Sequence, residues 1–156
     1  MTAIVVLVAV LVAALVVGAL LRARAGTVRE TEAAPAVSEN RRTLLTEAGV
    51  LGGAGPTVLH FSADWCGPCA AVRRVIHQVL GNLDTRLAPN LARAVEVEVD
   101  IDKNPALAKE LGVLSLPTTF LFDSALTQRY RVSGVPAATD LEAALTPLCD
   151  PGTSNP

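Results

Sequence analysis

The stretch Phe61–Ala70, FSADWCGPCA, decides the fold of this chain, because two cysteines lie in it between two strongly patterned segments. The residues 57–63, TVLHFSA, are mostly apolar or β-branched, which is typical of a buried strand. After the cysteines, apolar residues recur at helical spacing and polar residues take the opposite face. The apolar set is Val72, Val75, Ile76, Val79, Leu80 and Leu83. Cys66 and Cys69 are therefore expected where a buried strand gives way to an amphipathic helix.

The residues that follow continue an alternation of strands and helices. The residues 94–102, AVEVEVDID, alternate strictly between apolar and acidic residues and so predict a strand. A short helix is expected over 104–112, strands over 118–123 and 129–134, and a last helix over 139–148, with Thr139 and Glu142 spaced as a capping box. This order predicts an α/β domain with a mixed central sheet flanked by helices, parallel at first and antiparallel at its end.

The chain opens with an apolar run that bears on its location. From Ala3 to Leu21 no residue is charged or strongly polar. As a helix, these roughly 19 residues would reach about 28 Å, close to the ~30 Å hydrocarbon core of a bilayer. We expect a transmembrane anchor over 1–21, a flexible linker over 22–42, a domain over 43–150 and a disordered tail over 151–156. A short apolar patch near Leu44 predicts a helix or partial strand at the entry to the domain.

The alternative for this run is a cleavable signal peptide, since Ala23 and Ala25 precede Gly26 as in an A-x-A cleavage site. Against it, no Lys or Arg precedes the run, and the run exceeds a usual h-region. Arg22, Arg24 and Arg29 follow the run instead, so the positive-inside rule predicts a single-pass membrane protein with its domain in the cytoplasm. An extracytoplasmic domain is the alternative.

The spacing of the cysteines favours redox chemistry over metal binding. Two thiols two residues apart at the start of a helix can form a disulfide, and helix N–H groups favour the thiolate of Cys66. A zinc site needs about four ligands, which Cys66, Cys69, the distant Cys149 and two scattered histidines do not supply. A purely structural disulfide over so short a loop would stabilise the fold little. Cys149 is interpreted as an idle thiol, with an intermolecular or regulatory role as the alternative.

The motif WCGPC at Trp65–Cys69 resembles the active site of the thioredoxin family. Three more segments resemble that family: VDIDKNP at 99–105, GVLSLPTTFLF at 112–122 and VSGVP at 132–136. The resemblance covers roughly residues 57–148. It implies a thioredoxin-like fold in which Cys66 is the nucleophile, Cys69 resolves the mixed disulfide, and Trp65, Gly67 and Pro68 complete the motif. It also implies a cis peptide before Pro117, which would lie opposite Cys66, substrate hydrogen bonds from the backbone of Leu116, and a glycine turn at Gly134.

The chain departs from the family in two respects near the cysteines. Thioredoxins carry a buried aspartate where this chain has His60, and a lysine where it has Glu98. We hypothesise that His60, held by Glu98, accepts the proton that activates Cys69; the alternative is a histidine buried for packing alone. The second departure is Ser62, in place of a second tryptophan.

The chain is therefore expected to be a membrane-anchored thiol–disulfide oxidoreductase that reduces protein disulfides. A non-catalytic domain that binds peptides along the Pro117 groove is the rival from another class. No flavin or nicotinamide fingerprint occurs, so we expect no cofactor beyond the Cys66–Cys69 disulfide, no metal, and a protein electron donor such as a reductase. We also expect a monomer. With 13 basic and 15 acidic residues, the net charge of −2 gives no reason to expect nucleic acid as a partner.

Overall fold

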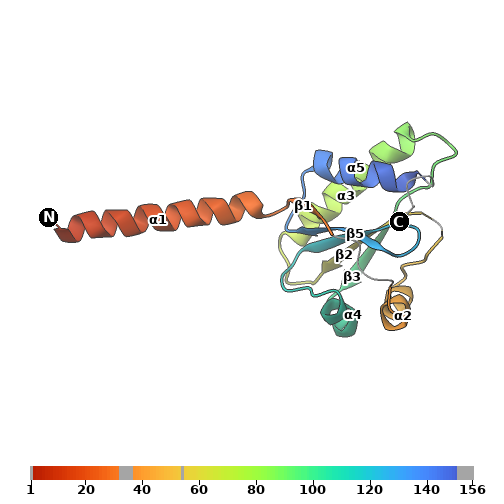
Figure 1. Cartoon of the computed structure of the whole chain (residues 1–156), viewed down its shortest axis with the longest axis horizontal. Helices are drawn as coiled ribbons and strands as arrows, with labels where there is room; N and C mark the ends of the chain where they lie inside the picture. The colour runs from red at the N-terminus through yellow and green to blue at the C-terminus, as the bar shows by residue number, and fades with distance from the viewer. Residues whose placement is uncertain (1, 32–36, 54, 151–156) are drawn as a thin grey trace.

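The structure, a computed structural model, describes residues 2–31, 37–53 and 55–150. A long helix precedes a domain in which four helices and a short 3-10 turn surround a sheet (Figure 1). The elements are α1 (Thr2–Arg24), β1 (Val28–Glu30), α2 (Glu39–Glu47), β2 (Thr57–Ser62), α3 (Cys69–Arg86), β3 (Val95–Asp100), α4 (Pro105–Glu110), β4 (Thr118–Phe122), β5 (Gln128–Ser133), α5 (Ala138–Leu145) and η1 (Thr146–Cys149).

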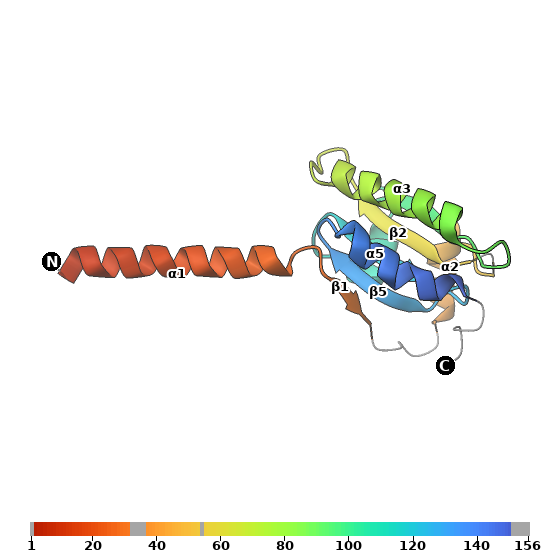
Figure 2. The same cartoon turned by 90° about the horizontal axis from the view of Figure 1, so that it is seen from above.

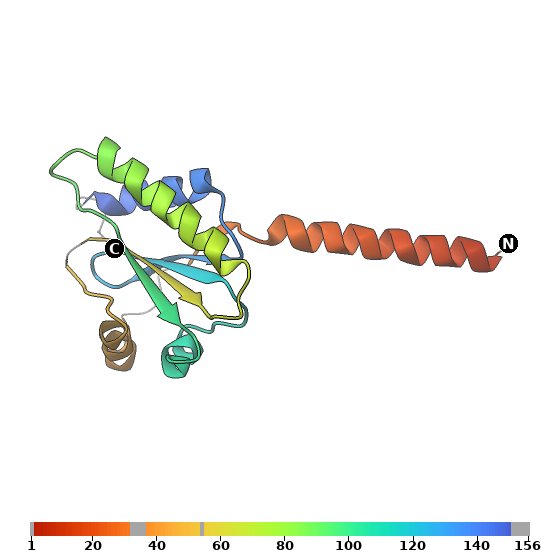
Figure 3. The same cartoon turned by 180° about the vertical axis from the view of Figure 1, so that it is seen from behind.

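The five strands form one mixed sheet in the order β1-β5-β4-β2-β3. The β2–β3 pair is parallel, and the other pairs are antiparallel. Helices α3 and α5 cover one face, and α2 and α4 the other (Figure 3). The predicted α/β class, with a sheet that is parallel at first and antiparallel at its end, is confirmed.

The core has two parts because β2 and β4 carry apolar side chains on both faces. Every residue of β2 and of β4 is buried. On the α2–α4 side, Phe61 and Phe120 meet edge to face with ring centroids 6.1 Å apart. On the α3–α5 side, Val58 and Leu121 pack against Val72, Ile76 and Leu141. Burial on both faces makes these central strands rigid supports for the loops at their ends.

A strand lies in the segment that was expected to be a flexible linker. β1 pairs with β5, with Val28 opposite Val132. Just before it, the Gly26 N–H donates to the Ser133 carbonyl over 2.6 Å, and a Cβ at Gly26 would collide with the carbonyl of Val135. The prediction of a linker over 22–42 is therefore corrected: its early part belongs to the sheet. The domain also begins earlier than expected, since Ser38 caps α2 by accepting from the Arg41 N–H.

Helix α1 projects away from the domain, as seen from above in Figure 2. Its large side chains between Ile4 and Val17 are exposed. A search of the described residues finds no helix long and apolar enough to cross a membrane.

The end of the chain differs in detail from the prediction. The last helix stops at Leu145, and a 3-10 turn continues to Cys149. Ala137 is the N-cap of α5 and no side chain caps it, so the predicted capping box at Thr139 is wrong. The tail predicted over 151–156 lies outside the described residues.

Candidate redox site

A disulfide joins Cys66 and Cys69 at the end of β2, with their Cα atoms 5.5 Å apart. The two sulfurs differ in accessibility: Cys66 is half-buried, whereas Cys69 is only 3% exposed. An incoming disulfide can therefore reach Cys66, while Cys69 is shielded, as the sequence predicted.

The helix begins at Cys69, and Pro68 is its N-cap residue with φ −74°. Cys66 thus lies just outside the first turn of α3, not within it. The backbone around it is a compact turn, since the Cys66 N–H donates to the Ala63 carbonyl and the Cys69 N–H donates to the Cys66 carbonyl. Cys66 still faces the amino end of an 18-residue helix, where unpaired N–H groups favour a thiolate.

The other motif residues form the exposed edge of the site. Gly67 and Pro68 are exposed, and Trp65 is 69% exposed. The Trp65 indole donates to Asp102 Oδ2 over 3.1 Å, which ties the turn to the loop after β3. Gly67 has open space around it.

A second loop reaches the same end of the sheet. The Leu116–Pro117 peptide is cis, and the Gly134 N–H donates to the Pro117 carbonyl over 2.9 Å. Because Thr118, directly after Pro117, is paired with Phe61 near the end of β2, this loop lies beside the start of the cysteine loop. The structure thus brings Leu116, Pro117 and Gly134 together at the strand ends that carry the disulfide. Leu114, two residues before Leu116, is a second large apolar side chain with high exposure, at 93%.

Below the disulfide, His60 is fully buried on β2. Its Nε2 lies 2.9 Å from Glu96 Oε1, so the predicted hydrogen bond to Glu98 is wrong. Glu98 is the Cα partner of His60 across the β2–β3 pair, but its carboxylate accepts two hydrogen bonds from Arg73 of α3. His60 therefore bonds to Glu96, which lies two residues before Glu98 on the same face of β3.

The surroundings of His60 and Glu98 shift the pKa of each group and so set its charge. Burial lowers the pKa of His60 below 6.5, and the hydrogen bond to Glu96 and the charge of Glu98 oppose this only in part. The hydrogen bond from Arg73 lowers the pKa of Glu98 to about 2. At neutral pH the site therefore contains a neutral imidazole and an ionised, paired carboxylate.

The sequence reasoning missed Glu96, Arg73 and His77 as members of this group. His77 lies on the polar face of α3, and its Nε2 lies 2.7 Å from Glu96 Oε2. The available signal was the acidic face of β3 opposite a helix that carries Arg73 and His77 one turn apart.

Two further features bear on the chemistry. Cys149 is fully buried, and burial raises the pKa of its thiol, so it is inert in the folded domain. Among the described residues, no group of three His, Cys, Asp or Glu side chains could hold a metal ion.

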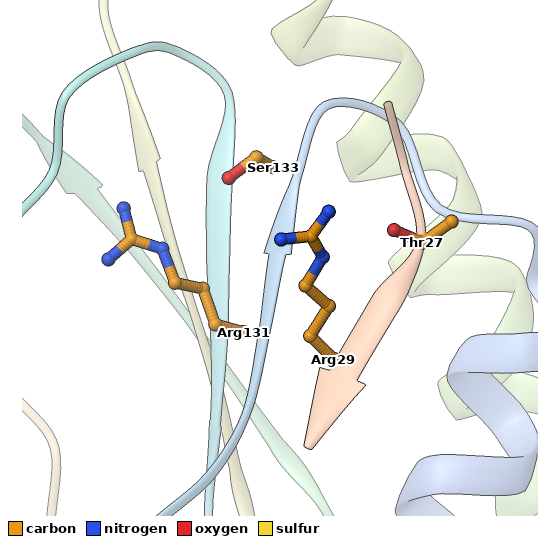
Figure 4. Close-up of a pocket in the computed structure, with 4 residues that line it drawn as sticks. All are labelled: Thr27, Arg29, Arg131 and Ser133. Carbon is orange, nitrogen blue, oxygen red and sulfur yellow. The ribbon is translucent and has the colours of Figure 1, made fainter. Parts of the chain in front are cut away.

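A pocket of about 170 Å³ lies at the β1–β5 edge and is lined by Thr27, Arg29, Arg131 and Ser133. Arg29 and Arg131 are cross-strand partners, and Figure 4 shows Arg29 between Ser133 on one side and Thr27 on the other. Arg131 lies over the Phe120 ring and donates to the carbonyls of Leu111 and Gly112. This edge of the domain is therefore cationic.

Comparison with solved structures supports the fold. The chain superposes on a thioredoxin from Halobacterium salinarum with a TM-score of 0.51 and 25% identity, over 64% of this chain and 88% of the other. It superposes on mitochondrial thioredoxin 3 of Saccharomyces cerevisiae with a TM-score of 0.52 and 21% identity, over 69% and 97% of the two chains.

Comparison of sequences identifies the family. A thioredoxin of Mycolicibacterium smegmatis is 37% identical over 73 residues, which are 47% of this chain and 61% of that protein. A thioredoxin of Aspergillus fumigatus is 33% identical over 93 residues, 60% of this chain and 77% of that protein. The match thus spans less than two thirds of the mycobacterial relative. The sequence profile of the thioredoxin family matches residues 46–146, which include the disulfide, His60 and Pro117. The chain belongs to the thioredoxin family.

Proposed function

We propose that the chain is a thiol–disulfide oxidoreductase that reduces protein disulfides. The observation that carries this proposal is the unequal burial of the two bonded cysteines at the start of α3. In the reduced protein, the Cys66 thiolate attacks a substrate disulfide, forms a mixed disulfide and expels one substrate thiolate. The Cys69 thiol loses its proton and attacks Cys66 Sγ, which restores the Cys66–Cys69 bond and releases the second substrate sulfur.

A protein substrate fits the surroundings of the disulfide better than a small one. The exposed side chains of Trp65 and Leu114 offer an apolar edge, and the Leu116 backbone beside the cis-proline is placed to pair with an extended segment. The oxidised enzyme would be recharged by a protein electron donor.

The proton from Cys69 would go to His60, with Glu96 replacing Glu98 as the group that orients the ring. Exchanging His60 for Gln should slow the resolving step while Cys66 is alkylated at nearly the wild-type rate. An equal loss in both steps would refute this role for His60.

The deciding experiment for catalysis is reduction of insulin by the dithiol-reduced chain. Activity that disappears in Cys66→Ser supports the enzyme. Turnover is expected to stop after the first attack in Cys69→Ser, which should trap the mixed disulfide. If the wild-type chain binds peptides but reduces nothing, the domain is a binding module instead.

We further propose that α1 anchors the domain to a membrane. The uncharged run over 3–21 and the exposed aliphatic side chains of α1 support this role. The sheet end that carries the disulfide is also the end at which α1 joins, because Gly26 bonds to Ser133 beside Gly134. Together with Arg29 and Arg131 nearby, this arrangement would hold the disulfide close to anionic headgroups, within reach of membrane-proximal substrates.

Flotation with vesicles tests the anchor: the full chain should rise with the vesicles and a fragment starting at Ala25 should not. The arginines after the apolar run favour a domain in the cytoplasm, where the glycine–proline pair between the cysteines suits a reductant. An impermeant thiol reagent applied to intact cells should leave Cys66 unlabelled. Labelling of Cys66 would support the extracytoplasmic alternative.

A further inference from the structure

Three side chains form a continuous row of polar contacts from the interior to the surface. His60 Nε2 lies 2.9 Å from Glu96 Oε1, and Glu96 Oε2 lies 2.7 Å from His77 Nε2. Exposure rises along the row, with side-chain values of 0% for His60, 18% for Glu96 and 62% for His77. The two histidines thus share one carboxylate, and only the outer histidine meets water freely.

The hydrogen bond to Glu96 fixes which nitrogen of His60 can act as a base. A carboxylate only accepts hydrogen bonds, so the neutral ring donates through Nε2–H and leaves the lone pair on Nδ1. Nδ1 is buried and has no hydrogen-bond partner among the described residues. The next residue along β2, Phe61, has its carbonyl oxygen 3.9 Å from Cys69 Sγ. The unpartnered nitrogen is therefore available on the strand that lies under the resolving cysteine.

We propose that Glu96 and His77 form the exit route for the proton that Cys69 releases during resolution. This inference rests on the proposed thiol–disulfide exchange. The Cys69 proton passes to His60 Nδ1, and the Nε2 proton of His60 passes to Glu96. The protonated Glu96 then donates to Nε2 of His77 in the tautomer that carries its proton on Nδ1, which the exposed ring reaches by exchange with water. The Nδ1 proton of His77 leaves to water. The Cys69 thiolate then attacks Cys66 Sγ, the bond between Cys66 and the substrate breaks, and its electron pair leaves on the substrate sulfur.

The charged residues around His60 do not compete with it or with His77 for Glu96. Glu96 and Glu98 face His60 from β3, and Arg73 acts on it from α3, where His77 contacts Glu96. Arg73 occupies the carboxylate of Glu98 with two hydrogen bonds, so it does not compete for Glu96. The residue beside His60 on β4 is the uncharged Thr119.

The test follows resolution of a mixed disulfide between Cys66 and a chromogenic aryl thiol, by stopped flow in the full chain in detergent. Glu96→Gln should slow release of the aryl thiol about 100-fold, the lower end of the contribution of a positioned acid–base group. His77→Gln should slow it less than Glu96→Gln does in dilute buffer, because water can still reach the partly exposed Glu96. Added imidazole should restore the rate of His77→Gln, because a free imidazole can take the proton from the partly exposed Glu96, and should not restore Glu96→Gln.

The exposed neighbour Gln78 provides the matched control, and Gln78→Ala should resolve at the wild-type rate with no response to imidazole. Alkylation of Cys66 should be unchanged in all three variants. Wild-type resolution by His77→Gln in dilute buffer, or a slow rate that ignores imidazole, would overturn the route. Failure of the wild-type chain to reduce insulin would instead overturn the proposed function, so the two failures can be told apart.

Discussion

The buried histidine should leave a measurable mark on the pH dependence of stability. His60 is fully buried, and burial lowers its pKa below the 6.5 of an unfolded chain. Below pH 6.5 the unfolded chain therefore takes up a proton at position 60 that the folded domain does not bind. Proton uptake by the unfolded state lowers the free energy of unfolding as the pH falls.

The size of the effect follows from one proton. The slope approaches about 1.4 kcal/mol per pH unit while the folded His60 stays neutral. Between pH 6.5 and 5.5 the loss has an upper bound of about 1 kcal/mol, because the unfolded group is only half protonated at the start of that window. The contribution of Glu98 is lost at lower pH, between 4.5 and about 2, and does not overlap with it.

The assay is urea unfolding of the oxidised domain, in a fragment that starts at Ala25 and so keeps β1, between pH 7.5 and 5. His60→Gln is the matched variant, since its amide still donates to Glu96 but does not titrate. The wild-type free energy should fall more than that of His60→Gln between pH 6.5 and 5.5, by up to about 1 kcal/mol. Parallel curves for the two proteins would refute the reasoning.

Three further predictions test other parts of the structure. Gly26→Ala should lower the free energy of unfolding by about 1–3 kcal/mol more than Gly53→Ala, because both have positive φ but only Gly26 meets a backbone carbonyl; equal losses in urea unfolding would show that the segment before β1 is not packed on Val135. Arg73→Gln should raise the pKa of Glu98 toward 4.5 in a carboxyl NMR titration, because the hydrogen bond from Arg73 is the largest cause of the low pKa; a titration that does not move would contradict the pairing. Cys149 should react with a thiol reagent only in denaturant, while Cys66 reacts in the reduced native domain; rapid labelling of Cys149 without denaturant would show that η1 opens.

Much of the domain was predictable because its central segments are long and strongly patterned. The apolar run before Trp65 and the strict alternation over 94–102 each allow one interpretation, and both strands are present. β1 was missed because three residues, VRE, carry no period, and their strand character comes from pairing with β5 a hundred residues later.

The site was predictable at the cysteines and less so below them. The WCGPC motif alone predicts disulfide exchange at Cys66 and Cys69. The hydrogen-bond partner of His60, by contrast, depends on which carboxylate of the neighbouring parallel strand its side chain can reach. Glu96 and Glu98 lie on the same face of β3, and the choice between them is made by Arg73, which lies on α3 and binds Glu98. No pattern within β2 or β3 alone contains that information.

The most direct test of the account is the ionisation of Cys66, since every proposed step begins with its thiolate. In reduced Cys69→Ser, the rate of alkylation should be measured against pH. The account predicts a half-maximal rate at a pH clearly below 8.5, the value of an unperturbed cysteine thiol. A midpoint at or above 8.5 would contradict it.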